Sequence, residues 1–196
     1  SLSSDCHIWC LGASASFREG GLMKNILVLC TGNSARSILC EALLNRLGAG
    51  RIRAFSAGSD PKASPHPAAL SLLAGEGYDM AGFASKKWDV FAGEGAPQMD
   101  IVITVCDNAA GESCPIWPGA PVSAHWGIAD PAAIEGEGQQ EAFLSAYRQL
   151  GQRVEALLTL EFENMEAEEL KVALNRIGAQ SDGATDLAQA KGTEHG

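Results

Sequence analysis

The stretch ILVLCTGNSARS, Ile26 to Ser37, decides the fold because it places an apolar run, a cysteine, a loop of small residues and an arginine in direct succession. A short, continuous run of Ile, Leu and Val is typical of a strand that is buried on both faces of a parallel sheet. The residues from Ser37 to Leu47 then carry leucines at helical spacing and end before Gly48. The stretch therefore predicts a strand, a tight loop and a helix.

The rest of the sequence alternates between strand and helix patterns in the same way. Segments that predict strands are Asn25–Leu29, Arg53–Ala57, Ile101–Val105 and, more weakly, Pro121–Ala124. Segments that predict helices are Ser37–Leu47, Pro67–Ala74 and Glu141–Leu160, the last of which is strongly amphipathic. This alternation predicts an α/β fold built from βαβ units, with a mostly parallel sheet and helices on both of its faces.

The limits of these patterns suggest how the chain is divided. Residues 1–22 show neither periodicity nor turn signals and are expected to be an unstructured N-terminal extension. One domain is expected over 23–160, followed by an extra charged helix within 161–178. Residues 179–196 are small, polar and aperiodic, which is typical of a disordered tail.

Composition and charge exclude several classes of protein. The chain has 196 residues, of which 46% are hydrophobic, so it can bury a sizeable core in one domain. A net charge of −10 argues against nucleic-acid binding, which needs a basic face. No apolar run approaches the roughly 18 to 20 residues of a bilayer-spanning helix. We therefore expect neither a nucleic acid nor a membrane as a partner.

The six cysteines predict neither a zinc site nor a disulfide framework; they stand at positions 6, 10, 30, 40, 106 and 114. They form no C-x-x-C pair and no zinc-finger spacing with His, so no metal or other cofactor is expected. The chain is also not small, and it shows no convincing signal peptide. We therefore expect a reducing, cytoplasmic location, with Cys6 and Cys10 incidental and Cys40 in the core.

The loop after the first strand has the composition of an oxyanion-binding site. Ligands of open α/β sheets bind beyond the carboxyl ends of the strands, and the backbone N–H groups at a helix N-terminus attract anions. Gly32 can adopt a positive φ there, and Arg36 adds a planar fork for two oxygens. The expected oxyanion-binding residues are Thr31, Gly32, Asn33, Ser34, Ala35 and Arg36.

The positive electrostatic field of these N–H groups and of Arg36 also predicts that Cys30 is a nucleophile. It would lower the pKa of Cys30 and make it a thiolate at neutral pH, with Asn33 and Ser37 as stabilising partners. A buried strand-end cysteine and a surface arginine are the simpler interpretation of the two residues taken alone. Their position between a buried strand and a helix start favours a nucleophile in an anion cradle.

At these residues the chain resembles a known family. CTGNSARS after a strand near the domain start is similar to the signature loop of the low-molecular-weight tyrosine phosphatase fold, and the resemblance runs from Met23 to about Leu158. It implies a four-stranded parallel sheet, a Cys nucleophile, an Arg clamp and an Asp general acid from a distant loop. Asp130, in HWGIADPA, matches that acid, which would protonate the leaving oxygen.

The segment from Thr104 to Pro131, TVCDNAAGESCPIWPGAPVSAHWGIADP, is similar to the arsenate reductases of this fold. That resemblance implies that Cys30 attacks arsenate, that Cys106 then attacks the arsenylated sulfur, and that Cys114 carries the disulfide outward. Reduction of As(V) to As(III) takes two electrons, which one disulfide supplies. The implied partners are arsenate and thioredoxin or another thiol reductant.

Two alternatives stay open. A low-molecular-weight protein tyrosine phosphatase needs only the nucleophile, the arginine and the acid, although Ala132 and Ala133 stand where such enzymes often carry aromatic residues. A non-catalytic, anion-responsive module would need only the cradle. The three cysteines together with Asp130 favour the reductase.

One departure concerns a potassium site that some members of the family carry beside the loop. Glu41 and Ser56 match its first two ligands, but Lys86 stands at the third. The ammonium group of Lys86 would replace the ion.

Overall fold

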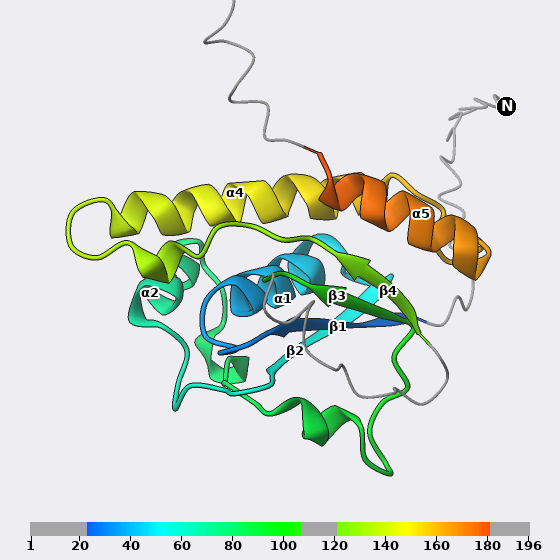
Figure 1. Ribbon diagram of the computed structural model, residues 1–196, viewed down its shortest axis with the longest axis horizontal. Coiled ribbons are helices and arrows are strands. Elements are labelled where there is room, and N and C mark those ends of the chain that lie inside the picture. The colour runs from blue at the N-terminus through cyan, green and yellow to red at the C-terminus, as the bar shows by residue number, and fades with distance from the viewer. Residues whose placement is uncertain (1–22, 107–120, 181–196) are drawn as a thin grey trace, which may run out of the picture.

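The structure is a computed structural model that describes residues 23–106 and 121–180 (Figure 1). The predicted extension at 1–22, with Cys6 and Cys10, lies outside the described residues. So do Cys114 and residues 181–196 of the predicted tail.

Four parallel strands form the centre of the molecule, and they confirm the predicted α/β fold. They are β1 (Lys24–Cys30), β2 (Ile52–Gly58), β3 (Ile101–Thr104) and β4 (Val122–His125). Their order in the sheet is β2-β1-β3-β4, so the strand that carries ILVLC is central and has a neighbour on each side. The side chains from Ile26 to Leu29 are fully buried, as expected for a strand covered on both faces.

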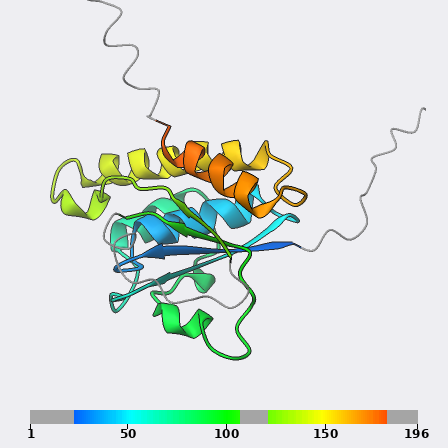
Figure 2. The same ribbon diagram turned by 45° about the vertical axis from the view of Figure 1, so that its right-hand side comes forward.

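Helices cover the two faces of the sheet unequally (Figures 1 and 2). One face packs against the main core, to which four α-helices contribute: α1 (Arg36–Leu47), α2 (Pro67–Gly75), α4 (Gln139–Leu158) and α5 (Ala167–Gly178). The other face carries Leu27 and Leu29, which pack against Phe91 of the short 3₁₀ helix η2 (Trp88–Phe91) and against Met99. The predicted helices on both faces are thus present in unequal form: the α-helices of the described residues lie on one face, and the 3₁₀ helix η2 lies on the other.

The sequence patterns place the strands and the helices α1, α2 and α4 within two residues of their observed ends. The 3₁₀ helices η1 (Met80–Gly82), η2 and η3 (Pro131–Ala133) were not predicted, because a single helical turn has no periodicity to detect. Within the described ranges, no helix combines the length and the apolar character that a membrane span requires.

Two features of the fold position the loop between β1 and α1. The register pairs Cys30 with Gly58, so the carboxyl ends of β1 and β2 meet at one edge of the sheet. α1 begins at Arg36 without a side-chain cap, and its residues from Ser37 to Leu44 are all buried. The helix is therefore held in the core, and its N-terminal N–H groups lie at the same edge of the sheet as Cys30.

Candidate active site

A cavity of about 400 Å³ lies at the carboxyl edge of the sheet, where the sequence places its candidate site. The loop from Cys30 to Arg36 forms one wall, and Asp130 and Ala132 approach it from η3. The structure therefore brings the predicted nucleophile, the predicted anion-binding residues and the predicted acid to one cavity. Further lining residues, which the sequence analysis did not identify, are Asp60, Lys62, Ser64, Pro65, His66 and Pro67.

Asn33 holds the loop in its shape. Its side-chain amide donates to the hydroxyls of Ser37 and Ser56, both at 2.9 Å, and its Oδ1 accepts from the N–H of Lys86 at 2.7 Å. Its φ is +43°, so Asn33, and not Gly32, is the loop residue in the left-handed region. Asn tolerates this conformation better than most residues, and three hydrogen bonds from a buried amide fix it there.

The segment after β2 supports the loop from outside. The N–H groups of Asp60, Lys62 and His66 donate to the carbonyl oxygens of Thr31, Gly32 and Ser34 at 3.0, 2.9 and 2.8 Å. Because these carbonyls are held on the outer side, N–H groups of the loop are left for an anion in the cavity. The sequence could have indicated that this segment lines the site, since it follows a strand that ends at the same edge of the sheet.

Gly58 allows β2 to approach the loop closely. A Cβ atom at this position would lie 2.3 Å from the carbonyl oxygen of Thr31 and 2.8 Å from that of Cys30. Only glycine fits between these two backbone groups.

The guanidinium of Arg36 has protein partners at its two Nη atoms but none at Nε among the described residues, which leaves a donor for an anion. Its Nη1 donates to the carbonyl of Ile128 at 3.0 Å, and its Nη2 lies 3.6 Å from Oδ2 of Asp130. Its Nε is buried and has no hydrogen-bond partner among the described residues. Leaving such a donor unpaired costs about 1–3 kcal/mol, which a bound oxyanion would recover.

Cys106 lies beside Cys30, because β3 is the neighbour of β1 in the sheet. Its sulfur accepts a hydrogen bond from the N–H of Thr31 at 3.3 Å and lies 3.6 Å from the Thr31 hydroxyl. The Cys106 thiol also lies close enough to Cys30 to raise its pKa. Cys40, by contrast, is fully buried on α1, where burial raises its pKa to about 12. The third predicted relay cysteine, Cys114, lies outside the described residues.

The surroundings of Cys30 act on its pKa in both directions. The neighbouring Cys106 thiol and burial raise it above its ordinary value, whereas Arg36 and the N–H of Gly32 lower it. The predicted lowering of the Cys30 pKa is therefore opposed in this arrangement, and the thiolate stays a prediction. The expected stabilisers Asn33 and Ser37 bond to each other, and Asn33 also bonds to Ser56, so both shape the loop.

Asp130 begins η3 and faces Arg36 across the mouth of the cavity. Its Oδ1 accepts from the N–H of Ala132 at 3.0 Å, which fixes one side of the carboxyl group. The side chain is 44% exposed, so protons can exchange with solvent. This position is compatible with the predicted role as an acid.

Glu41, Ser56 and Lys86 meet behind the loop. Ser56 donates a hydrogen bond to Oε2 of Glu41. Burial raises the pKa of Glu41, while the Ser56 bond and the charge of Lys86 oppose this effect. The ammonium group of Lys86 donates to the carbonyl of Ala84 at 2.9 Å. In the described part of the chain, no cluster of three or more His, Cys, Asp or Glu residues could hold a metal ion.

Lys86 leads to a prediction about potassium. Its fixed positive charge near Glu41 disfavours a cation at this position, so exchanging potassium for sodium at constant ionic strength should leave kcat and KM unchanged. Lys86→Asp should create a dependence on potassium. A strong potassium activation of the parent protein would contradict the prediction.

Comparison with known proteins agrees with this geometry. Residues 25–171 match the family model described as low molecular weight phosphotyrosine protein phosphatase. An arsenate reductase from Bacillus licheniformis is 33% identical over 133 residues, which is 67% of this chain and 92% of the relative. A glutaredoxin arsenate reductase from Synechocystis is 31% identical over 69% of this chain and 97% of the relative.

Solved structures give the same result. An arsenate reductase in its oxidised state superposes with a TM-score of 0.58 at 28% identity, covering 70% of this chain and 98% of the other. A tyrosine phosphatase from Erwinia amylovora shares the fold, with a TM-score of 0.56 at 22% identity over 73% of this chain and 97% of its own. The chain therefore belongs to the low-molecular-weight phosphotyrosine protein phosphatase family and is related to the arsenate reductases within it.

Proposed function

We propose that this chain is a cytoplasmic arsenate reductase in which Cys30, Cys106 and Cys114 act in sequence. The observation that carries the proposal is the second thiol at the cradle: the Cys106 sulfur accepts a hydrogen bond from the N–H of Thr31, the residue that follows Cys30, and this thiol raises the pKa of Cys30. A phosphatase has no need of a thiol at this place. The identity to arsenate reductases from several bacteria supports the same activity.

The first step places arsenate in the loop from Thr31 to Arg36. The N–H groups and the guanidinium hold its oxygens; Cys30 releases its thiol proton to solvent, and the resulting thiolate attacks arsenic. A proton from Asp130 lets one oxygen leave as water. The product is an arsenylated Cys30 in which arsenic is still As(V).

The second step transfers the two electrons. The sulfur of Cys106 attacks the sulfur of Cys30, an S–S bond forms, and the S–As bond breaks with its electron pair going to arsenic. Arsenite, As(III), leaves. Cys114 then attacks Cys106 and releases Cys30 as a thiol, and thioredoxin or another thiol reductant reduces the Cys106–Cys114 disulfide.

A phosphatase remains the second candidate, because Cys30, Arg36 and Asp130 line one cavity that is larger than a single oxyanion. No Phe, Tyr or Trp stands among the described residues that line it, so among these residues only the His66 imidazole offers a ring to a phenyl group.

One assay separates the two functions. Arsenite release is measured with a thioredoxin system and with a glutaredoxin and glutathione system, beside hydrolysis of an aryl phosphate. We expect repeated turnover of arsenate with one of the thiol systems and slow hydrolysis of the aryl ester. Rapid hydrolysis without arsenite release would assign the chain as a phosphatase.

A further inference from the structure

The segment from Trp126 to Ile128 links β4 to Asp130 and is held on several sides. The N–H groups of Trp126 and Ile128 donate to the carbonyls of Thr104 and Val105 at 2.7 and 3.3 Å. Arg153 of α4 donates to the carbonyls of Trp126 and Gly127 at 2.8 and 3.2 Å. The carbonyl of Ile128 accepts from Arg36. The segment thus contacts the cradle arginine and the end of the strand that precedes Cys106.

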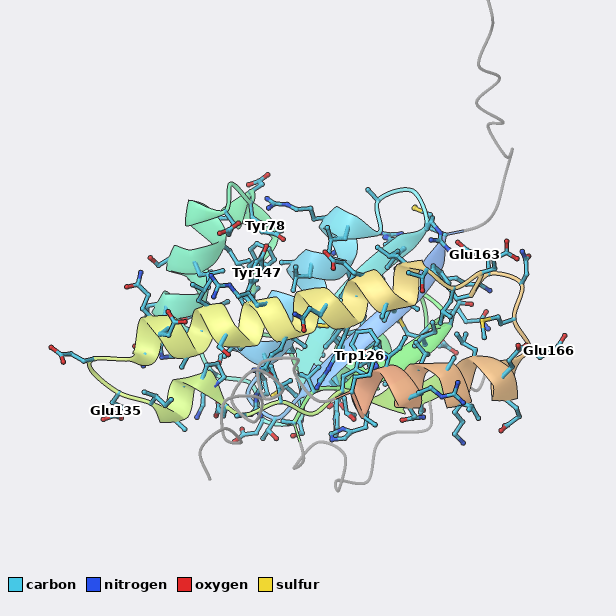
Figure 3. The ribbon with its side chains drawn as sticks, turned by 90° about the horizontal axis from the view of Figure 1, so that it is seen from above. Tyr78, Trp126, Glu135, Tyr147, Glu163 and Glu166 are labelled. Atoms are coloured by element: carbon cyan, nitrogen blue, oxygen red, sulfur yellow. The ribbon has the colours of Figure 1, made fainter. Side chains whose placement is uncertain are left out.

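α5 holds the start of this segment. The indole N–H of Trp126 donates to the carbonyl of Leu174 at 2.9 Å, and the side chains of Trp126 and Leu174 are both fully buried. The side-chain Oδ1 of Asn175 accepts from the N–H of His125 at 3.1 Å. Figure 3 shows Trp126 between α4 and α5.

Gly178 makes the contact especially close. A Cβ atom on it would lie 2.1 Å from the carbonyl oxygen of His125 and 2.8 Å from Cδ1 of Trp126. Any side chain at this position would therefore push α5 and the Trp126 segment apart. Leu174, Asn175 and Gly178 all lie beyond residue 171, where the match to the family model ends.

We infer that the C-terminal half of α5 positions the Trp126–Asp130 segment and, through it, the guanidinium of Arg36 and the carboxyl group of Asp130. Leu174, Asn175 and Gly178 are thus positioning residues for the oxyanion site. The activity readout of this inference rests on the proposed function, whereas its binding readout does not. A misplacement of about 1 Å at a reacting group can cost up to about 100-fold in rate.

Two variants of α5 test the inference in the full-length protein. Gly178→Val inserts a side chain against His125 and Trp126, and Asn175→Leu removes the acceptor for the His125 N–H. Asn175→Asp keeps that acceptor and serves as the conservative variant. Val172→Ala changes an exposed residue of the same helix. Glu163→Gln weakens an ion pair with Arg51 elsewhere in the fold and serves as the control for lost stability.

Binding of inorganic phosphate by calorimetry, kcat and KM for arsenite release, and urea unfolding are measured for each variant. We expect about tenfold weaker phosphate binding and roughly 10- to 100-fold lower kcat/KM for Gly178→Val, a smaller loss in the same direction for Asn175→Leu, and near-parent values for Asn175→Asp and Val172→Ala.

The outcomes separate positioning from stability. If Gly178→Val and Asn175→Leu bind phosphate like the parent and lose only as much stability as Glu163→Gln, α5 has no positioning role. If Gly178→Val does not fold, the two Asn175 variants decide the question. If the parent releases no arsenite, the proposed function fails, and phosphate binding alone still tests the inference.

Discussion

Cys30→Ser is expected to lower arsenite release by roughly 10⁴-fold or more, while the variant still binds inorganic phosphate. A serine hydroxyl is far less acidic and less nucleophilic than a thiol, and it cannot form the disulfide that supplies the electrons. The anion cradle does not depend on the sulfur, because Asn33 and the segment after β2 hold its shape. The measurements are arsenite release and calorimetric binding of phosphate.

Cys40→Ala is the matched control, because Cys40 is buried on α1 and takes no part in the proposed reaction. It should lose some stability and keep its activity below its unfolding transition. Arsenite turnover by Cys30→Ser at a rate near that of the parent would remove Cys30 from the mechanism. Loss of phosphate binding together with activity would show that the substitution distorts the loop.

The sequence predicts the ends of the strands to within two residues. Because the cavity lies at the carboxyl ends of the strands, most of the residues that line it follow from this prediction. Cys30 and Arg36 flank a loop whose role follows from its place between a buried strand and a helix. Asp130 required the family resemblance, because an Asp-Pro pair alone is ordinary turn chemistry. The approach of Asp130 to Arg36 then depends on how η3 lies across the sheet edge.

Local sequence patterns could not predict how residues at the ends of neighbouring strands affect one another. The strand order places Cys106 beside Cys30, and this contact reverses the expected direction of the Cys30 pKa. The left-handed residue of the loop is Asn33, because its amide reaches Ser37, Ser56 and Lys86 from that conformation. Both facts depend on residues distant in the sequence.

Cys106→Ala is expected to stop arsenite release altogether and to make Cys30 more reactive. Without Cys106 the described part of the site holds no second thiol that could attack the arsenylated Cys30, so the proposed transfer of the two electrons cannot occur. The largest cause that raises the pKa of Cys30 is also removed, while Arg36 and the Gly32 N–H remain. The pKa of Cys30 should therefore fall, and its alkylation by iodoacetamide, followed on the Cys30 peptide by mass spectrometry, should reach its plateau at a lower pH than in the parent.

Cys114→Ser gives the decisive contrast, because the proposed relay needs Cys114 only after arsenite has left. Both electrons for the first turnover come from Cys30 and Cys106, so this variant should release one equivalent of arsenite and then stall. Mass spectrometry should find a Cys30–Cys106 disulfide. Cys106→Ala should release none under the same conditions. If either variant instead turns over at the parent rate with thioredoxin, an external thiol attacks Cys30 or its first disulfide directly, and the internal relay is wrong.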